Sequence, residues 1–536
     1  MSETTPDENA RRGEAASEPN PPFFAVPATA LRRFGATILD PVTADRLGDE
    51  PAPRPVAYIP NRLLVPGLTQ DQLEAPLQML GRLGDEMQFT VTVVESSLLG
   101  LANELEYADV LGNVTHSVAQ ITPVPGRVGP PLDAWSVLQQ ARVTYGRDEV
   151  ASWGLNHVLM ATGYMGGVGY MGGVGYMGGV GYMGGVGYMG GVGYMGGVGY
   201  MGGVGVPGTA SGRGPVTLAM PSPPRTGGRS PVVAILDTGL GEHPWFEDPA
   251  FADRDPRLRG TQIGLRFPAD ANPEGTGVSI DLVNQALDPL AGHGTFIAGI
   301  VRQHCPDARI VAVPVMYGDG AADEADVITA LNALALWHWA ARDGKVKGDP
   351  VDVVNLSLGY YHESANPVRD EAALFSILDQ LSTDGVAVIA AAGNGGTSEC
   401  FWPAALAGRP STGGVPITSV GARNPTGDTV ALFSNTGPWV TTYQKGVAVV
   451  STMPVTLEGS QRSEVAVPHG TYRARATPDP DCYATGFGLW SGTSFSCPRF
   501  VGKVAAALSG SQAALNPMDR VAQVSEAVKV ALGDPS

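Results

Sequence analysis

The amino-acid sequence predicts an α/β protein: a three-layer domain with a mostly parallel central sheet, preceded by a small α+β module and a glycine-rich hexapeptide repeat. Three observations lead to this prediction. Over residues 230–534, continuous Val, Ile and Ala runs alternate with helical runs, which indicates a parallel sheet covered on both faces. Between Val56 and Gly146, strand-like and helix-like periodicities alternate over a shorter stretch. Residues 164–205 repeat one hexapeptide.

Length and charge narrow the class of protein. The chain has 536 residues, too many for one ordinary domain. Its 34 basic and 52 acidic residues give a net charge of −18, so we expect an acidic, soluble protein with neither nucleic acid nor an anionic membrane as partner. The N-terminus lacks the basic and apolar regions of a secretory signal, and no run of about 18 apolar residues occurs. We therefore expect a cytoplasmic location, with export by an atypical route left open.

The four cysteines are widely spaced and form no CxxC pair. In a reducing compartment we expect free thiols, with Cys305 and Cys497 packing as small apolar residues. A bridge between Cys400 and Cys482, each in a loop, is the alternative, because loop partners cannot be read from a sequence.

The chain before the repeat divides into two parts. Residues 1–55 are rich in Pro, Ala, Arg and Glu without periodicity, and we expect a disordered tail. Residues 56–150 are expected to form the small α+β module. Its predicted elements are a strand at Val56–Val65, a helix capped by Thr69, a strand at Met87–Val94 and a helix at Leu132–Val143.

Residues 164–205 are seven perfect copies of Tyr-Met-Gly-Gly-Val-Gly. Because half of the residues are glycine, ordering this segment loses much conformational entropy and gains few side-chain contacts. A flexible linker is expected, with a root-mean-square span of roughly 35 Å. The alternative is that the Tyr, Met and Val of each hexad stack into an ordered layer or a self-association strip. Residues 206–229, rich in Pro and Gly, are expected to be an irregular connector.

Residues 230–534 alternate between buried strands and helices. The expected strands are Val232–Leu236, Arg309–Val315, Val351–Leu356, Val386–Ala391 and Ile417–Val420, and the expected helices are Thr295–Gln303, Ala322–Ala341, Val368–Leu381 and a run after Ser494. Two loop-like segments, Asp248–Asn272 and Pro454–Tyr483, are expected near the carboxyl ends of the strands. Neither shows the ligand spacing of a metal site, so we expect no metal.

Three polar residues stand at the ends of these elements. Asp237 ends the first apolar strand, His293 opens a helix between two glycines, and Ser494 opens a later helix after Gly-Thr. Alone, each would be an ordinary turn or cap residue. Together they supply an acid, a base and a nucleophile, and strand carboxyl ends are where functional residues collect in α/β sheets.

These segments resemble the subtilisin-like serine peptidases, the subtilases. The matching motifs are Val232-Val233-Ala234-Ile235-Leu236-Asp237-Thr238-Gly239, Gly292-His293-Gly294-Thr295 and Gly492-Thr493-Ser494-Phe495-Ser496-Cys497-Pro498. Within the last motif, Ser496 and Cys497 replace the Ala or Met usual in the family. The resemblance covers residues 230–534 and implies a serine endopeptidase that needs no cofactor and acts on polypeptides. Asp237 would orient His293, which would act as the base for Ser494.

The same resemblance assigns further roles. Asn394, in Ala390-Ala391-Ala392-Gly393-Asn394-Gly395, would donate to the oxyanion beside the backbone N–H of Ser494. An extended substrate would pair with Ser357, Leu358 and Gly359. One wall of the pocket for the residue before the scissile bond would be formed by Ala391, Ala392 and Gly393. Where the family commonly has a second glycine this chain has Tyr360, which puts the specificity in question.

Two questions stay open from the sequence. The module at 56–150 resembles the prodomain of subtilisin-like zymogens, which inhibits the enzyme with a tail lying in the active site; an unrelated accessory domain is the alternative. A scaffold or binding protein with a silent peptidase domain, assembling through the repeat, is the alternative to an enzyme.

Overall fold

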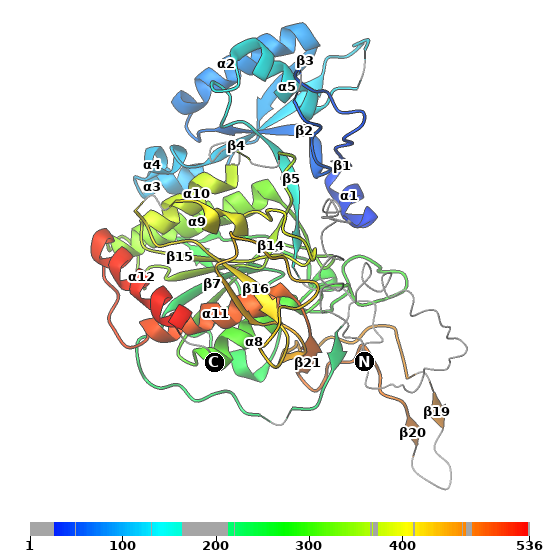
Figure 1. The fold of residues 1–536 in the computed structure, drawn as a ribbon, viewed down its shortest axis with the longest axis vertical. Coiled ribbons are helices and arrows are strands. Elements are labelled where there is room, and N and C mark those ends of the chain that lie inside the picture. The colour runs from blue at the N-terminus through cyan, green and yellow to red at the C-terminus, as the bar shows by residue number, and fades with distance from the viewer. Residues whose placement is uncertain are drawn as a thin grey trace, which may run out of the picture.

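We describe the protein from a computed structural model, drawn as a ribbon in Figure 1. The structure describes residues 26–48, 50–129, 131–162, 213–218, 220–364, 367, 373–410, 413–463, 465–467 and 474–533. The predicted linker or strip at 164–205 lies outside these ranges, as do residues 1–25 of the predicted tail and residues 206–212 of the connector.

The C-terminal domain is built on a seven-stranded sheet whose neighbouring strands are all parallel. The order is β17-β16-β15-β13-β7-β11-β8, with bounds β7 Val232–Asp237, β8 Ala252–Asp253, β11 Arg309–Pro314, β13 Val353–Leu356, β15 Ala387–Ala391, β16 Thr418–Arg423 and β17 Thr442–Lys445. The predicted parallel sheet is confirmed. Its longer strands are continuous apolar runs because both faces are covered.

Helices cover the two faces of this sheet, giving three layers (Figure 1). Side chains alternate along β7, so Val232 and Leu236 pack in one cluster with α9 and α10, while Val233 packs in another with α8, α11 and α12. The bounds are α8 His293–His304, α9 Glu324–Arg342, α10 Ala373–Thr383, α11 Thr493–Leu508 and α12 Pro517–Gly533. In the described part of the chain, no helix combines the length and the apolar character needed to cross a bilayer.

The N-terminal part is a second sheet with helices against it. Its strands are β1 Thr37–Ile38, β2 Ala57–Pro66, β3 Phe89–Val93, β4 His116–Pro123 and β5 Gly154–Ala161, and its helices are α1 Ala28–Phe34, α2 Gln70–Met87, α3 Leu99–Glu104, α4 Ala108–Gly112 and α5 Ala134–Tyr145. As expected, Thr69 caps α2, forming a capping box with Gln72. The predicted strands and helices of the module coincide with β2, α2, β3 and α5.

The structure differs from the sequence prediction at both borders of this module. Residues 26–55 were expected to be part of a disordered tail, yet they contain α1 and β1, and Ala30 of α1 is completely buried. The helix has seven residues, too few to show a periodicity, and it is held by packing near Met160 and Ala321. The module was expected to end at residue 150, but it continues through β5 to Ala161.

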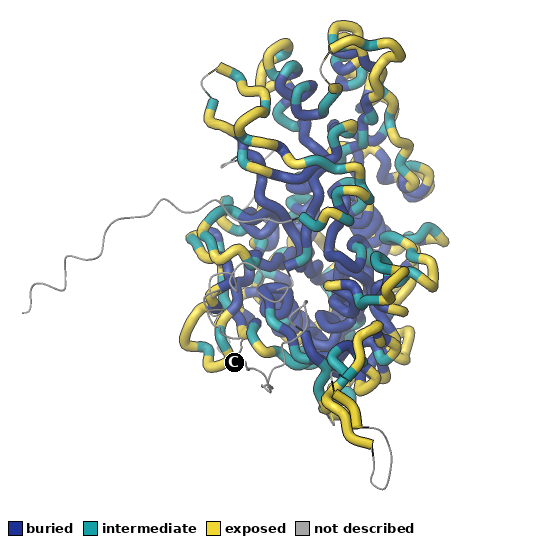
Figure 2. The backbone as a smooth tube through the Cα atoms, turned by 90° about the vertical axis from the view of Figure 1, so that its right-hand side faces the viewer, coloured by how far each residue is buried: buried dark blue, intermediate teal, exposed yellow. Residues whose placement is uncertain are grey.

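Strand β5 joins the two parts of the molecule (Figure 1). On one side it pairs with β2 of the module. Nearer its end it pairs antiparallel with two strands of the C-terminal domain, β14 (Leu358–Gly359) on this same side and β12 (Ala321–Asp323) on the other. Figure 2 shows buried backbone continuing from the module into the domain. The end of β5 therefore lies where the parallel sheet presents its carboxyl ends.

The remaining elements are short and mostly form the surface around the site. They are β6 Gly214–Pro215, β18 Val449–Thr452 and β21 Phe487–Trp490 in one sheet, the hairpins β9 Arg257–Leu258 with β10 Thr261–Gln262 and β19 Ala466–Val467 with β20 Arg475–Ala476, and the 3₁₀ turns Pro244–Phe246, Ala269–Ala271 and Ala404–Gly408. The exposed β19–β20 hairpin extends away from the molecule in Figure 2. All four cysteines are free thiols, including Cys400 and Cys482.

Candidate active site

The acid and the base predicted from the sequence are in contact. His293 Nδ1 lies 2.7 Å from Asp237 Oδ1, and both side chains are fully buried. Asp237 is the last residue of β7, and His293 is the first residue of α8. A Cβ atom on Gly294 would collide with the carbonyl oxygen of Gly239, so only glycine lets the helix begin this close to the end of β7. The small residues around His293 thus serve its approach to Asp237.

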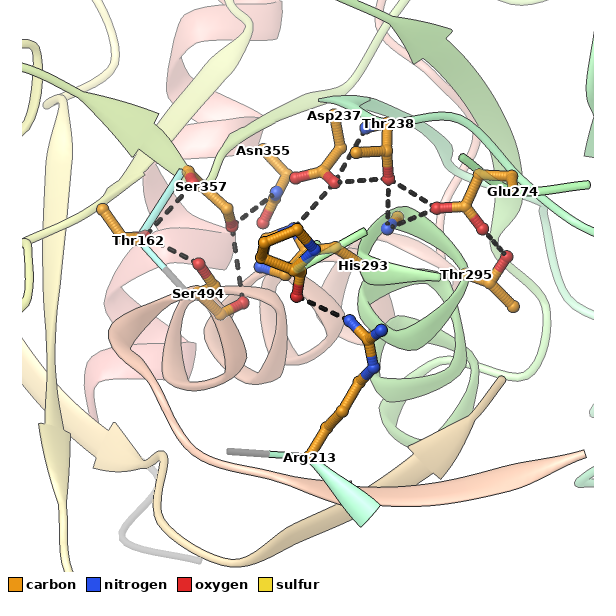
Figure 3. A network of polar contacts seen from close by, with 12 residues as sticks. Thr162, Arg213, Asp237, Thr238, Glu274, His293, Thr295, Asn355, Ser357 and Ser494 are labelled. Atoms are coloured by element: carbon orange, nitrogen blue, oxygen red, sulfur yellow. Dashed lines mark hydrogen bonds and ion pairs between the residues drawn. The ribbon is translucent and has the colours of Figure 1, made fainter. Parts of the chain in front are cut away.

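Figure 3 draws Ser494 together with His293 and Asp237, and the serine hydroxyl is bonded to a residue of the N-terminal part. Ser494 Oγ is 2.8 Å from Oγ1 of Thr162, the residue that follows β5. The other ring nitrogen of His293, Nε2, has no hydrogen-bond partner among the described residues. Trp490 and Phe495 pack against the imidazole ring, each with its centroid 5.4 Å away. The structure therefore pairs the predicted acid with the predicted base and bonds the predicted nucleophile to Thr162.

The carbonyl oxygen of Thr162 accepts two hydrogen bonds from the predicted oxyanion donors. The backbone N–H of Ser494 donates to it at 3.3 Å, and Nδ2 of Asn394 donates to it as well. The orientation of the Asn394 amide is set by its Oδ1, which accepts from the N–H and the hydroxyl of Thr493 at 3.0 and 2.9 Å. A peptide carbonyl thus occupies the position that the sequence analysis assigned to an oxyanion.

The predicted substrate-binding edge, Ser357, Leu358 and Gly359, pairs with β5. Leu358 is opposite Ala161, and the N–H of Thr162 donates to the carbonyl of Ser357 at 2.9 Å. From the other side, the N–H of Ala161 donates to the carbonyl of Gly320 at 2.8 Å. Strand β5 is therefore held on both sides, as an extended peptide in a cleft would be.

The predicted pocket wall, Ala391, Ala392 and Gly393, lies at the end of β15, directly before Asn394. All three residues are buried. The carbonyl of Ala392 accepts from Asn435 at 2.8 Å, and the N–H of Gly393 donates to Thr493 Oγ1 at 3.2 Å. The bond to Thr493 links the predicted wall to the segment that carries Ser494.

A second buried carboxylate, which the sequence analysis missed, lies beside the triad. Glu274 accepts from the N–H of Gly294 at 2.9 Å and from the hydroxyl of Thr295 at 2.6 Å. It is joined to Asp237 through the hydroxyl of Thr238, which is 2.5 Å from Glu274 and 3.1 Å from Asp237 (Figure 3). Burial raises the pKa of Glu274 to about 7. Glu274 follows a loop-like segment, and no motif in the sequence marks it.

Arg213, the first described residue after the repeat, is also anchored at the site. Its guanidinium donates to the carbonyls of Asp288 and Pro289 at 2.8 and 2.5 Å and lies 5.2 Å from the ring centroid of Trp490. Trp490 in turn packs against His293. Thr162 and Arg213, the described residues on either side of 163–212, therefore lie beside predicted catalytic residues: Thr162 bonds Ser494, and Arg213 packs on the Trp490 that contacts His293 (Figure 3).

Further back along β5, His157 forms a buried charged cluster with the C-terminal domain. Its Nδ1 is 2.6 Å from Glu324, and its Nε2 is 2.9 Å from Glu363. Burial alone would lower the pKa of His157, but the two carboxylates outweigh it and raise the pKa to about 10. His157, His362 and Glu363 are close enough together to be tested as a metal site. A ring that donates from both nitrogens has no lone pair for a metal, so this geometry is an ion-pair cluster.

Comparisons with known proteins identify the family of the C-terminal domain. A family model described as the subtilase family matches residues 228–529, more than half of the chain. The chain is 27% identical over 250 residues to Serine protease AprX of Bacillus subtilis (strain 168), covering 42% of this chain and 48% of that protein. It is 30% identical over 238 residues to Subtilisin BL of Lederbergia lenta, covering 44% and 72%.

Among solved structures, the crystal structure of a lanthipeptide protease matches 53% of this chain and 74% of its own, with 22% identity and a TM-score of 0.34. The chain spans between 36% and 48% of the length of AprX and three further curated relatives. The region matched by the family model includes Asp237, His293, Asn394 and Ser494. The chain belongs to the subtilase family.

Proposed function

We propose that this protein is a serine endopeptidase in which Asp237, His293 and Ser494 form the catalytic triad. One observation carries the proposal: a peptide carbonyl, that of Thr162, accepts from both Ser494 N and Asn394 Nδ2 beside a bonded Asp–His pair. Backbone and amide donors directed at the developing negative charge are the main source of rate enhancement in acyl transfer. The substrates are polypeptides bound in extended form.

The reaction follows from these positions. Ser494 Oγ attacks the substrate carbonyl carbon while Nε2 of His293 takes the hydroxyl proton. Asp237 accepts a hydrogen bond from Nδ1 and stabilises the imidazolium. The carbonyl oxygen becomes an oxyanion bound by Ser494 N and Asn394. The imidazolium then gives its proton to the leaving amine, and water hydrolyses the acyl-enzyme by the same steps.

We also propose that residues 26–162 act as an intramolecular inhibitor. Strand β5 occupies the path of a substrate, and Thr162 takes the position of the residue before the scissile bond. Its side chain adds a second restraint, since Oγ1 of Thr162 bonds the nucleophile while Nε2 of His293 lacks a partner among the residues described. The peptide bond after Thr162 would then be the enzyme's own first cleavage site.

Two measurements on one set of proteins test both proposals. A fluorophosphonate probe should label the wild type and leave Ser494→Ala unlabelled, because only an activated serine reacts. The matched control is Ser496→Ala, which removes a buried hydroxyl two residues away that bonds the Thr493 carbonyl. Intact mass spectrometry should find a chain ending at Thr162 in the wild type and only the uncut chain in Ser494→Ala. Absence of labelling in folded wild type, together with absence of cleavage after Thr162, would favour the scaffold interpretation.

A further inference from the structure

His157 of β5 is bound by the C-terminal domain through both ring nitrogens, its backbone N–H and one face of its ring. Both ring nitrogens face carboxylates, and its own N–H donates to Glu324 at 3.1 Å. The side chains of His157, Glu324 and Glu363 are 2%, 1% and 6% exposed. The ring also stacks on Tyr360, with centroids 4.4 Å apart and planes 24° apart.

The two carboxylates come from the same segments that grip an extended strand. β12 ends at Asp323, opposite Val158 of β5, and Glu324 is the next residue. β14 ends at Gly359, and the chain continues past the stacked Tyr360 to Glu363. Each edge of the cleft therefore delivers one carboxylate, and the pair belongs to the C-terminal domain whether or not the module is docked.

The position of His157 along β5 can be counted from Thr162, the residue whose carbonyl meets Ser494 N and Asn394. Counting Thr162 as the first residue before the scissile bond, His157 is the sixth. The pairing of β5 with β12 and β14 is antiparallel from Val158 to Ala161, so a peptide in the same track has its sixth residue at the same place.

We propose that Glu324 and Glu363 form a buried acidic subsite that selects substrates with a cationic side chain, histidine in particular, six residues before the cleaved bond. This inference rests on the proposed function in one respect, namely that β5 marks the path of a substrate.

Charge is the reason for the selection. A buried carboxylate without a cation is strongly destabilised, so a neutral side chain at this position leaves the pair uncompensated. His362 lies 3.4 Å from Glu363 and offsets part of its charge, whereas the bonds of Glu324 described above go to His157. Although burial raises the pKa of Glu363, His362 and His157 hold it well below its usual range, so the carboxylate is ionised at neutral pH.

The test uses fluorogenic peptide amides that copy residues 157–162, with an acetylated N-terminus. One peptide keeps histidine at the sixth position, and a second has glutamine there. Each is hydrolysed by the full-chain protein at pH 7, and kcat/KM is compared. The docked module competes equally with both peptides, so it cancels in the ratio of their kcat/KM values. We expect the histidine peptide to be cleaved about tenfold faster, as suits a buried charge pair.

The double variant Glu324→Gln/Glu363→Gln should reduce this ratio to about one, while Glu526→Gln, which removes one exposed charge on α12, should leave it unchanged. A ratio near one in the wild type overturns the subsite, and that result stands even where the double variant fails to fold. A ratio of about ten that persists in the folded double variant overturns it too. Hydrolysis of neither peptide above the Ser494→Ala background contradicts the proposed function instead.

Discussion

Strand β5 meets the C-terminal domain at two places, and the contacts there differ in kind. At Thr162 the partners bond the main-chain carbonyl oxygen and N–H, beside the side-chain hydroxyl that bonds Ser494. At His157 two carboxylates bond a side-chain ring. Every peptide offers a carbonyl oxygen, whereas few side chains offer a positive charge. Under the two proposals, the main-chain contact at Thr162 would therefore accept any sequence, and the contact at His157 would distinguish one sequence from another.

Removing the proposed nucleophile or base beside Thr162 should have the largest effect on peptide hydrolysis. Ser494→Ala and His293→Ala should each lower kcat/KM for peptide hydrolysis by about 10⁴-fold or more, and the double variant should be little worse, because the groups act as one unit. The measurement is steady-state hydrolysis of the histidine peptide. Losses that multiply in the double variant would mean that the two residues act independently.

The oxyanion donor comes next in size. Asn394→Ala should lower kcat by roughly 10²–10³ with little change in KM, since the amide interacts mainly with the charge that develops in the transition state. Asn424→Ala, in a surface turn where the side chain bonds Thr429, is the control and should behave as wild type. A change confined to KM would show that Asn394 binds the substrate without stabilising the oxyanion.

At the other end of the strand, His157→Gln should weaken the docking of β5 on the C-terminal domain. Glutamine removes the buried charge, so full-chain activity toward a peptide should rise by about tenfold. Arg62→Gln is the matched comparison. Arg62 pairs with Asp323 at 2.9 Å across the same boundary, but its side chain is 35% exposed, so the rise should stay below about threefold. Equal effects of the two variants would remove the distinction between the buried and the exposed pair.

The smallest effect is a pH dependence of self-inhibition. Docking raises the pKa of His157 from 6.5 to about 10, so its contribution to docking is complete below pH 6.5 and is lost as the pH rises through 10. The groups facing it are Glu324 of α9, Tyr360, His362 and Glu363 beyond β14, and Tyr58 of β2. The activity of His157→Gln divided by that of wild type should therefore fall toward one between pH 7 and pH 10. A ratio that rises over this range would contradict the assignment.

The sequence was sufficient where the signal is local. Asp237, His293 and Ser494 each stand among small or apolar neighbours that predict the end of an element there, and the structure bonds Asp237 to His293. The pairing of strands far apart in the chain could not be predicted from such local signals. The contacts of Thr162 and His157 exist only because β5 pairs with residues about 160 to 200 positions later.

The carboxylates show the same limit. Glu324 reads as an ordinary acidic residue in the first turn of a helix, and Glu363 stands in a loop. Glu274 follows a Pro- and Gly-rich segment with no motif. Each becomes notable only through burial and partners, which depend on tertiary packing and leave no periodic trace.

Because β5 lies between β12 and β14, its departure would leave two unpaired strand edges facing each other. Exposed edges usually invite pairing with other chains and so promote aggregation. Here the edges are short, three residues in β12 and two in β14. An edge of that length gives too few ladder hydrogen bonds to hold a strand by itself, so an incoming chain must also bond the Ser494 N–H and the Asn394 amide at one end and the acidic pair at the other. An enzyme without its module would thus hold a passing peptide only briefly and would not template the growth of a sheet.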